Sequence, residues 1–348
     1  MTAKESADTV PSPSAGAAHL GAPAVTAVLP LFNKRHYVER CLASVAEAAR
    51  SHGSVEVIVV DHGSTDGSYE AAARWRDSLR LCREPVGTIA HVRNTGAKLA
   101  SARILAFVDS DCVVPPNYFA TLEAIIRDRR VAATGFEVGV PDAGTWVERV
   151  WQRLHDRGDA GPRHYVNAAS FSVTREAFEA VGGFNERLIT GEDTDICLRL
   201  RSAGFEIWAA PALRVIHLDN PRTLAAFFRK ELWRGLGGFG ATLLRRRMRS
   251  SAMVIAFGIM VAAALFVTFS PLPSPTRVVA SAMLVLAVPL CTVAFRFWQS
   301  RRVYAPIRSV ILYFAFYLAR LSALCVLLGR GLWTDRSAAG SRTASGSS

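Results

Sequence analysis

Two short apolar runs, each followed at once by carboxylates, constrain the fold of this chain most strongly. The runs Val55–Val60 and Ile104–Val108 are almost continuously apolar and rich in β-branched residues. Such runs are typical of strands buried on both faces of a parallel sheet. Asp61 follows the first run, and Asp109 and Asp111 follow the second. Because ligands of open α/β sheets bind beyond the carboxyl ends of the strands, we expect these carboxylates to share one site.

The rest of residues 25–222 alternates between strand-like and helix-like segments. Short apolar runs predict further strands at Val25–Leu31, Leu79–Cys82, Val131–Val138 and Ala168–Val173. Helical spacing or helix-start signals predict helices at Arg35–Arg50, Ile89–Ala100, Trp146–His155 and Glu192–Ala203, and one from Asn117 after Pro115-Pro116. This alternation predicts an α/β fold with a doubly wound, mostly parallel sheet.

The same carboxylates also indicate the chemistry of the site. Asp109 and Asp111 are two residues apart where the chain turns, so both can face one cation. A further acidic pair, Glu192 and Asp193, follows Gly191 at the start of a predicted helix. Hard oxygen ligands of this kind suit a divalent cation such as Mg²⁺ or Mn²⁺, which neutralises the charge of a diphosphate. The sequence therefore predicts a metal-diphosphate site.

Charge is distributed unevenly along the 348 residues. Residues 226–348 contain 16 Lys or Arg but only two acidic residues, Glu231 and Asp335, and so account for the net charge of +12. This basic part is also strongly apolar. Arginines beside long apolar runs indicate contact with anionic lipid headgroups. We expect no nucleic-acid binding, because residues 1–225 show no basic and aromatic surface pattern.

The sequence divides the basic part into an interfacial helix, residues 223–250, and a membrane region, residues 251–330. Aromatic and basic residues are interleaved in Thr223–Leu244, as in a helix that lies on a membrane surface. Three apolar segments follow, each close to the roughly 20 residues that span a bilayer: Ala252–Phe269, Val278–Phe295 and Val310–Leu328. The third contains Arg320, so it is open whether this segment spans the membrane, is tilted or paired, or is only interfacial.

The arginines that flank these segments predict a topology. Four lie between residues 245 and 249, only Arg277 separates the first two segments, and four lie between residues 296 and 308. The positive-inside rule then places residues 1–250 and the loop 296–308 in the cytoplasm. The Arg- and Ala-rich composition is typical of a bacterium with a GC-rich genome. We therefore expect a multi-pass protein of the inner membrane with its N-terminal domain in the cytoplasm.

The two ends of the chain and its cysteines predict little structure. Residues 1–24 lack the apolar core of a signal peptide, and we expect a disordered leader there. Residues 331–348 are rich in Ser, Gly and Ala and predict a disordered tail. The six cysteines form no C-x-x-C pair, which favours free thiols over disulfides or a zinc site.

Six short motifs occur in a particular order: Val28–Asn33, Val59–Gly67, Arg93–Ala97, Asp109–Asp111, Gly182–Glu186 and Gly191–Arg199. In this order they resemble the family 2 glycosyltransferases of the GT-A fold, over roughly residues 25–240. The resemblance implies an inverting enzyme that takes a sugar from a nucleoside diphosphate donor with the help of Mg or Mn.

The resemblance also implies roles for residues of the donor and metal sites. Asp111 would contact the metal, Asp109 the donor ribose or the metal, and His217 would complete the metal shell as in some relatives. The other donor-binding positions are Pro30, Asn33, Asp61, His62 and Arg93. The family usually has Asp where this chain has His62. This departure leaves a thymidine or guanosine donor open beside uridine.

The catalytic group that the resemblance implies is Asp193. Inversion needs one carboxylate opposite the leaving group, which takes the proton of the acceptor hydroxyl. The start of a helix favours the ionised form of such a group. Glu192 would bind the acceptor or stiffen the loop, and Trp233 and Arg234 would clamp the diphosphate or the acceptor.

Most of these positions also have a purely structural interpretation. Asp61 and Asp66 can cap a turn, His217 can be a buried core histidine, and Asp195 can pair with Arg199 one helical turn away. Structural alternatives also exist for the remaining positions: a plain turn for Pro30 and Asn33, a surface helix charge for Arg93, first-turn helix acids for Glu192 and Asp193, and membrane anchoring for Trp233 and Arg234.

The leading interpretation is a membrane-anchored glycosyltransferase that transfers single sugars to a lipid-linked or cell-envelope acceptor. The Q-x-x-R-W pattern of processive synthases is absent, and a membrane tether would hold the site near an embedded acceptor. A catalytically inert scaffold that binds nucleotide sugars is the alternative from another class. A nucleotidyltransferase is disfavoured, because no Gly-rich basic loop occurs near the N-terminus.

Overall fold

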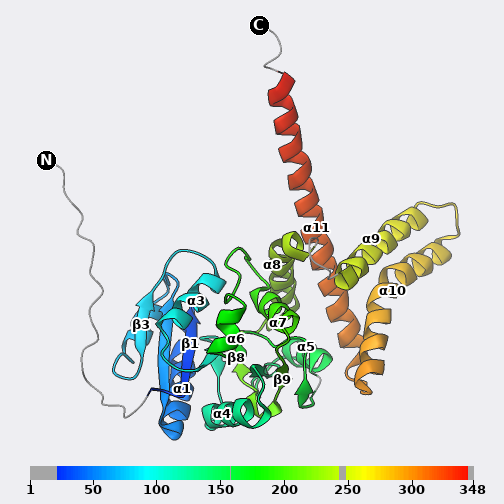
Figure 1. The fold of residues 1–348 in the computed structure, drawn as a ribbon. Helices are drawn as coiled ribbons and strands as arrows, with labels where there is room; N and C mark the ends of the chain where they lie inside the picture. Colours follow the sequence, from blue (N-terminus) through cyan, green and yellow to red (C-terminus); the bar gives the residue numbers. More distant parts are fainter. Residues whose placement is uncertain (1–21, 157, 243–247, 344–348) are drawn as a thin grey trace.

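The computed structural model describes residues 22–156, 158–242 and 248–343, with side chains described for 22–156, 158–237 and 252–329. Within these residues an eight-stranded sheet has the order β3-β2-β1-β4-β8-β6-β9-β7 (Figure 1). Its strands are β1 (Val25–Leu31), β2 (Val55–Asp61), β3 (Arg80–Arg83), β4 (Ile104–Val108), β6 (Ala133–Gly135), β7 (Gly161–Pro162), β8 (Ser170–Thr174) and β9 (Ile207–Ala209). Strands β1 to β4 are parallel, as are β6 and β9, whereas β7 and β8 are antiparallel to their neighbours. The predicted mostly parallel α/β sheet is confirmed.

The central strand β1 sets the edge at which a site can form. It pairs with β2 from Val25↔Val55 to Leu31↔Asp61, and with β4 on its other side. All residues of β1 and β4 are buried, as their continuous apolar sequence predicts. Because these strands are parallel, the residues that follow them emerge at one edge of the sheet.

Helices cover both faces of the sheet, as a doubly wound fold requires (Figure 1). Alternate side chains of β1 belong to different cores: Ala27 and Leu29 pack on the side of α1, whereas Val28 packs on the side of α7. The first face carries α1 (Val38–His52), α2 (Ser68–Ala73) and α4 (Tyr118–Arg129), and the second carries α3 (Ile89–Leu99), α6 (Arg175–Ala180) and α7 (Glu192–Ser202).

The sequence locates these elements well but misjudges the short ones. Strand β6 covers only the middle of the predicted Val131–Val138 strand. Helix α6 and strands β7 and β9 were not predicted, because two to six residues are too few to show a helical or strand period. The six cysteines are all free, as predicted.

A second, two-stranded sheet brings distant parts of the chain to the edge where β4 ends. Strand β5 (Cys112–Val113) directly follows the Asp109–Asp111 turn and pairs antiparallel with β10 (Ile216–His217). A 3₁₀ turn at Pro211–Leu213 precedes β10. The register sets His217 opposite Cys112. His217 is therefore held beside the carboxylates although it lies about a hundred residues further along the chain.

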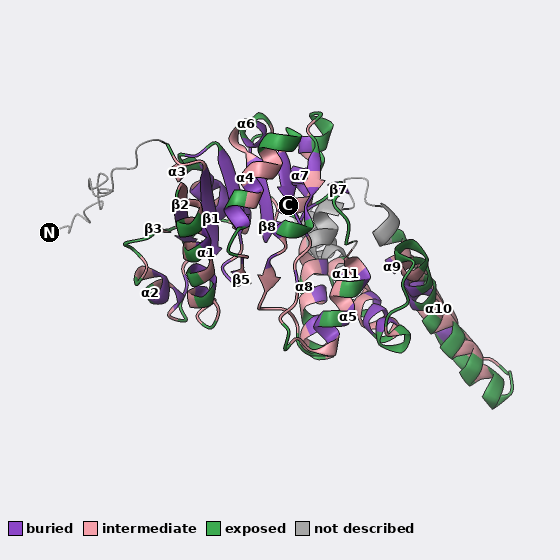
Figure 2. Cartoon of the chain, turned by 90° about the horizontal axis from the view of Figure 1, so that it is seen from below, coloured by how far each residue is buried: buried purple, intermediate pink, exposed green. Residues whose placement is uncertain are grey.

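Four long helices follow the sheet domain: α8 (Leu224–Thr242), α9 (Met248–Thr268), α10 (Ser274–Ser300) and α11 (Pro306–Thr343). They share an apolar core with α5 (Trp146–His155), while many side chains of α9 and α10 remain exposed (Figure 2). By length and composition, α10 and residues Pro306–Gly329 of α11 are able to cross a membrane, and the apolar part of α9, Ala252–Thr268, is shorter.

The structure can be compared with the predicted disordered tail but with only a small part of the predicted disordered leader. Residues 1–21 of the expected disordered leader, 1–24, lie outside the described residues. The expected disordered tail, 331–348, differs from the structure, because helix α11 continues to Thr343. Leu, Ala and Arg residues in this stretch have good helix propensity, which the Ser- and Gly-rich composition obscured. Residues 344–348 are not described.

Candidate active site

A cavity of about 1020 Å³ opens at the edge of the sheet where β1 and β4 end. The β1 and β4 loops contribute one side, and the start of α7 contributes another. Helices α8, α9 and α11 close the third side with Lys230, Trp233, Arg234, Val254, Phe316 and Arg320. The cavity is therefore bounded partly by the sheet domain and partly by the apolar C-terminal helices.

The carboxylates of Asp109 and Asp111 both line the cavity but have different partners. Asp109 Oδ1 lies 2.7 Å from Arg93 Nη2. Asp111 Oδ2 lies 2.7 Å from Lys34 Nζ, and its Oδ1 lies 3.4 Å from Nε2 of His217. The two side chains of this turn therefore divide between two neighbouring charge networks.

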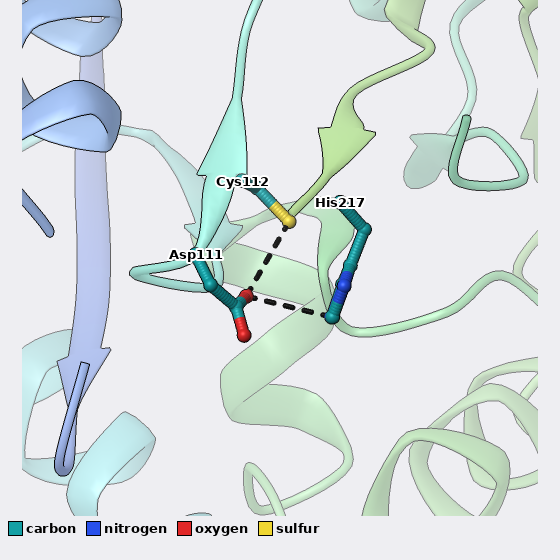
Figure 3. A group of neighbouring side chains, drawn as sticks. All are labelled: Asp111, Cys112 and His217. Atoms are coloured by element: carbon teal, nitrogen blue, oxygen red, sulfur yellow. Dashed lines mark hydrogen bonds and ion pairs between the residues drawn. The ribbon is translucent and has the colours of Figure 1, made fainter. Parts of the chain in front are cut away.

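Asp111, Cys112 and His217 form the described cluster that best fits a metal ion (Figure 3). Their ligand atoms lie within 4.8 Å of one another. Nδ1 of His217 is buried without a hydrogen-bond partner among the described residues, and burial lowers the pKa of this imidazole, which favours the neutral, ligating form. Burial raises the pKa of the Cys112 thiol, so the protonated sulfur is a poor ligand. A carboxylate and a neutral imidazole therefore fit a divalent cation.

Of the three predicted metal ligands, Asp111 and His217 are thus brought together, while Asp109 is turned toward Arg93. Burial acts to raise the pKa of Asp109, but the charge of Arg93 and its hydrogen bond, with a smaller contribution from Lys34, outweigh burial and lower this pKa. Asp109 therefore stays ionised in this network. Cys112 was not predicted as a neighbour of the site, because nothing in the sequence shows the β5–β10 register.

Lys34 is a site residue that the sequence did not reveal. Its ammonium lies between two carboxylates, 2.7 Å from Asp111 Oδ2 and 2.5 Å from Asp219 Oδ2. Burial alone would lower the pKa of Lys34, but the two carboxylates outweigh burial and raise it. The permanently charged amine links the loop after β1 to the segment between β10 and α8. Asp219 is 185 residues away, so no local pattern connects the pair.

Arg93 is the centre of a second network. Its guanidinium is buried and donates from Nη2 to Asp109 and from Nη1 to Glu192 Oε1 at 2.6 Å. Burial raises the pKa of Glu192, and the charge of Asp193 adds to this, whereas Arg93 opposes it. Because both guanidinium ends are engaged, Arg93 ties the end of β4 to the start of α7. The interpretation of Arg93 as a solvated surface charge is wrong.

Asp193 lies beside this network on the cavity wall. Its Oδ2 accepts a hydrogen bond from the Tyr165 hydroxyl at 2.6 Å, and its Oδ1 accepts one from the Thr194 backbone N–H at 2.6 Å. Gly191 precedes the helix with φ +83°, a conformation that residues with a Cβ rarely adopt. Removal from water and the charge of Asp193 raise the pKa of Tyr165 well above its usual value. Tyr165 therefore remains a hydrogen-bond donor to this carboxylate.

Only some of the predicted nucleotide-binding residues line the cavity. Pro30 and Arg93 line the cavity, but Asn33, Asp61 and His62 are not among the described lining residues. The fully buried Asp61 accepts hydrogen bonds from the backbone of the following turn, and His62 Nδ1 lies 2.8 Å from the Glu84 carbonyl oxygen. Asn33, at φ +50°, accepts a hydrogen bond from Thr65. These three residues shape the turns after β1 and β2, and their donor-binding roles stay predictions.

Trp233 and Arg234 line the cavity from α8, as the sequence predicts for a clamp. Trp233 is 57% exposed. Arg234 Nη1 lies 2.7 Å from Glu231 Oε1, and Nη2 of Arg320 lies 2.7 Å from Glu231 Oε2. The buried Glu231 therefore holds two cationic side chains at the cavity.

The comparisons with known proteins concern the family and the fold of the chain. Residues 26–182 match the family model described as "Glycosyl transferase family 2". Among curated proteins, glycosyltransferase AglE of Haloferax volcanii is 28% identical over 248 residues, 69% of this chain and 81% of that protein. The pre-mycofactocin glycosyltransferase of Mycobacterium tuberculosis is 28% identical over 265 residues, 72% of this chain but only about half, 54%, of that protein.

One solved structure supports the fold over nearly the whole chain. It is the mannosyltransferase PcManGT from Pyrobaculum calidifontis in complex with GDP-Man and Mn²⁺. The TM-score is 0.53 at 20% identity, and the match covers 95% of this chain and 91% of that one. At this identity the similarity concerns the fold alone.

Proposed function

We propose that this chain, a glycosyltransferase whose residues 26–182 form a family 2 domain of the GT-A fold, transfers one sugar at a time from its nucleotide-sugar donor with inversion. We further propose that the reaction depends on a divalent cation and that the acceptor is lipid-linked or destined for the cell envelope. The observation that supports this most is that Asp111, His217 and Asp193 line one cavity of about 1020 Å³.

The metal part of the proposal rests on Asp111 and His217. The chemistry that Mg²⁺ or Mn²⁺ supplies at such a site is neutralisation of the charge that grows on the leaving diphosphate. The cation would be held by Asp111 and His217, while Asp109 would face the donor ribose or share the cation. The similar solved structure contains Mn²⁺, which favours Mn as the first cation to test beside Mg.

The proton of the acceptor hydroxyl would go to Asp193. Tyr165 and the Thr194 N–H orient this carboxylate toward the cavity, and the N-terminus of α7 favours its charge. A single base on the face opposite the leaving group gives inversion. Arg93 fixes Glu192 and Asp109 on either side, so Glu192 would stiffen the loop rather than accept the proton.

The donor would enter from the ends of β1 and β2. Pro30 lines the cavity there, and we propose that Asn33, Asp61 and His62 support the nucleotide pocket through the turns that they stabilise. Lys34 supplies a fixed positive charge beside Asp111, where a diphosphate would lie.

The acceptor would approach from the C-terminal helices. Val254 and Phe316 give the cavity an apolar wall, with Trp233 and Arg234 beside it. An acceptor with a polar sugar or phosphate end and a lipid tail fits such a wall. We propose that the protein is an inner-membrane protein with its GT-A domain in the cytoplasm, because the arginine-rich ends of the apolar helices favour that side.

Nucleoside diphosphate release tests the proposal. We expect membranes that contain the protein, supplied with extracted lipid and either Mn²⁺ or Mg²⁺, to release the nucleotide from one of a set of UDP-, dTDP- and GDP-sugars. Asp111→Ala should abolish release. The matched control is Asp128→Ala, which removes a carboxylate that is 64% exposed on α4, and it should leave the rate unchanged.

The outcomes separate the parts of the proposal. Release from one donor that depends on Asp111 identifies the donor and supports the metal site. Donor binding without release, even with lipid added, would favour the inert scaffold. If Asp111→Ala retained full activity, Asp111 would not be a metal ligand.

Tyr165→Phe is expected to lower kcat by about tenfold to a hundredfold, because a hydrogen bond to a charged group contributes about 1.5–3 kcal/mol. Single-turnover rates with the donor bound measure this change, and the affinity for the donor should stay the same because Tyr165 acts on the base. Tyr69→Phe, whose hydroxyl bonds Arg76 outside the cavity, is the control. An unchanged kcat would show that Tyr165 does not act through Asp193.

A further inference from the structure

Helix α11 meets the length and composition of a membrane-spanning helix, but its surroundings do not suit a bilayer. Residues Pro306–Gly329 are long and apolar enough to cross. Yet the first part of α11 lies beside α8 and α5, which belong to the catalytic side of the molecule, while its C-terminal end extends past them (Figure 1). The inference below rests on the proposed membrane association and decides which helices cross.

One face of α11 is buried against the catalytic side over about three turns. Leu312, Tyr313, Tyr317 and Ala323 are buried, at the spacing of one helical face. The rings of Tyr313 and Trp151 of α5 are 5.7 Å apart between centroids. The middle of α11 therefore has protein, not lipid, along this side.

The charge at the centre of the apolar stretch agrees with this position. Arg320 lies near the middle of Pro306–Gly329, where a charge would be most costly in a bilayer. Its Nη2 is 2.7 Å from the buried Glu231 of α8, and its side chain lines the catalytic cavity together with Phe316. A cavity that admits a nucleotide sugar is open to water. The centre of α11 is therefore level with an aqueous site rather than with the hydrocarbon.

The opposite face of α11 is apolar and exposed. Ile307, Ile311, Leu318 and Val326 form this outer edge. A helix with protein on one side and an apolar edge on the other is suited to lie along a membrane surface. Such a position keeps the cavity next to the headgroups.

The α9–α10 pair differs from α11 because its two helices pack mainly on each other rather than on α8 and α5. Figures 1 and 2 show the α9–α10 pair projecting away from the sheet domain. Helix α10 contains 27 residues, or about 40 Å at 1.5 Å per residue, which is enough for a core of about 30 Å, and the apolar part of α9, Ala252–Thr268, is at the lower end of the roughly 17–25 residues that span a bilayer. Their exposed apolar side chains include Ile259, Leu265, Phe266, Val278, Met283 and Trp298. Several arginines lie at the end of α10 nearest the sheet domain, whereas only Arg277 lies near the outer turn.

We infer that the α9–α10 hairpin crosses the bilayer while α11 does not, and that α11 lies along the membrane surface as one wall of the catalytic cavity. The hairpin enters and leaves on the same side. The C-terminus therefore lies on the side of the GT-A domain, and not on the opposite side as three crossings would require.

Single-cysteine labelling of the full chain in intact cells tests this topology. The background carries Cys82→Ser, Cys291→Ser and Cys325→Ser, which removes the cysteines that are not buried. A membrane-impermeant maleimide is then applied to three variants: Leu272→Cys in the hairpin turn, Ser347→Cys in the tail, and Ser14→Cys before the GT-A domain as the same-side control. We expect labelling at 272 in intact cells, and labelling at 14 and 347 only after the membrane is opened.

Three other results would contradict the inferred topology. Labelling at 347 but not at 14 in intact cells would overturn the inference, because α11 would then cross. Protection of 272 in a protein that stays in carbonate-washed membranes would also overturn it, because the hairpin would not cross. A protein that partitions into the soluble fraction, as a monomer or with the hairpin covered by a second copy, would overturn both the inference and the proposed membrane location. Donor release in the same preparation would show separately whether the proposed reaction survives.

Discussion

Asp193→Asn is expected to lower kcat by about 10²–10⁴-fold, the usual contribution of a general base, while donor binding changes little. The amide has the same shape but cannot take the proton of the acceptor hydroxyl. It can still accept a hydrogen bond from Tyr165, so the local structure should persist. Single-turnover rates measure the chemical step, and equilibrium binding of the donor measures the ground state.

The control for this substitution is Glu176→Gln, which removes a carboxylate from the first turn of another helix, α6, on the surface. It should leave kcat unchanged. Glu192→Gln is the informative comparison, because Glu192 is paired with Arg93 and is expected to affect folding or loop order more than proton transfer. If Asp193→Asn retained nearly full activity while Glu192→Gln lost it, the base would be Glu192.

The sequence could predict the parts of this protein that depend on local patterns. The continuous apolar runs of β1, β2 and β4 identify buried parallel strands, and the carboxylates that follow β4 then have to lie at the sheet edge. Asp109 and Asp111 were located in this way, whereas Asp193, in the first turn of a predicted helix, was assigned its role from the family resemblance. Their cavity is an arrangement that the order of the elements already implies.

The partners of these residues could not be predicted, because each pair is closed by tertiary structure. Arg93 and Glu192 are 99 residues apart, and Tyr165 and Asp193 are 28 apart without a regular element in common. Lys34 meets Asp111 only because β1 and β4 are neighbours in the sheet. The direction of a side chain at a turn, which separates Asp109 from Asp111, is likewise not encoded in the spacing.

Composition alone also could not separate α11 from the crossing helices. An apolar helix is stabilised equally by lipid and by protein neighbours, so its hydropathy does not show which of the two surrounds it. The single polar exception, Arg320, left the position of the segment open in the sequence. Its buried partner on α8 is what distinguishes a docked helix from a spanning one.

Glu231→Gln is expected to destabilise the junction between α8 and α11 by about 1.5–3 kcal/mol, the usual contribution of a hydrogen bond to a charged group, because the two arginines that lose their partner are partly exposed to solvent. Glu231 is 2% exposed and binds both Arg234 and Arg320. Burial acts to raise the pKa of Glu231, but the two arginines outweigh burial and lower it. The junction is therefore stabilised above the ordinary glutamate pKa, and this stabilisation is lost as pH falls through the lower folded value.

Limited proteolysis between α8 and α11 as a function of denaturant measures this local stability in detergent. Glu47→Gln, an exposed glutamate on α1, is the control and should have no effect. Wild type should lose protection in acid, and Glu231→Gln should lack that part of the pH dependence. Equal protection of the variant and wild type at neutral pH would contradict a structural role for the pair.

A double substitution separates the charge from the docking itself. Glu231→Leu with Arg320→Leu removes both charges and leaves apolar groups between the same helices, which often restores or exceeds the original stability. Arg320→Leu alone should cost less than Glu231→Gln, because Arg234 still neutralises Glu231. If the double variant regains protection but α11 then crosses the membrane in the labelling assay, the ion pair specifies the position of the helix rather than its stability. If α11 stays docked, the apolar face around Tyr313 and Tyr317 is sufficient, and Arg320 acts on the cavity alone.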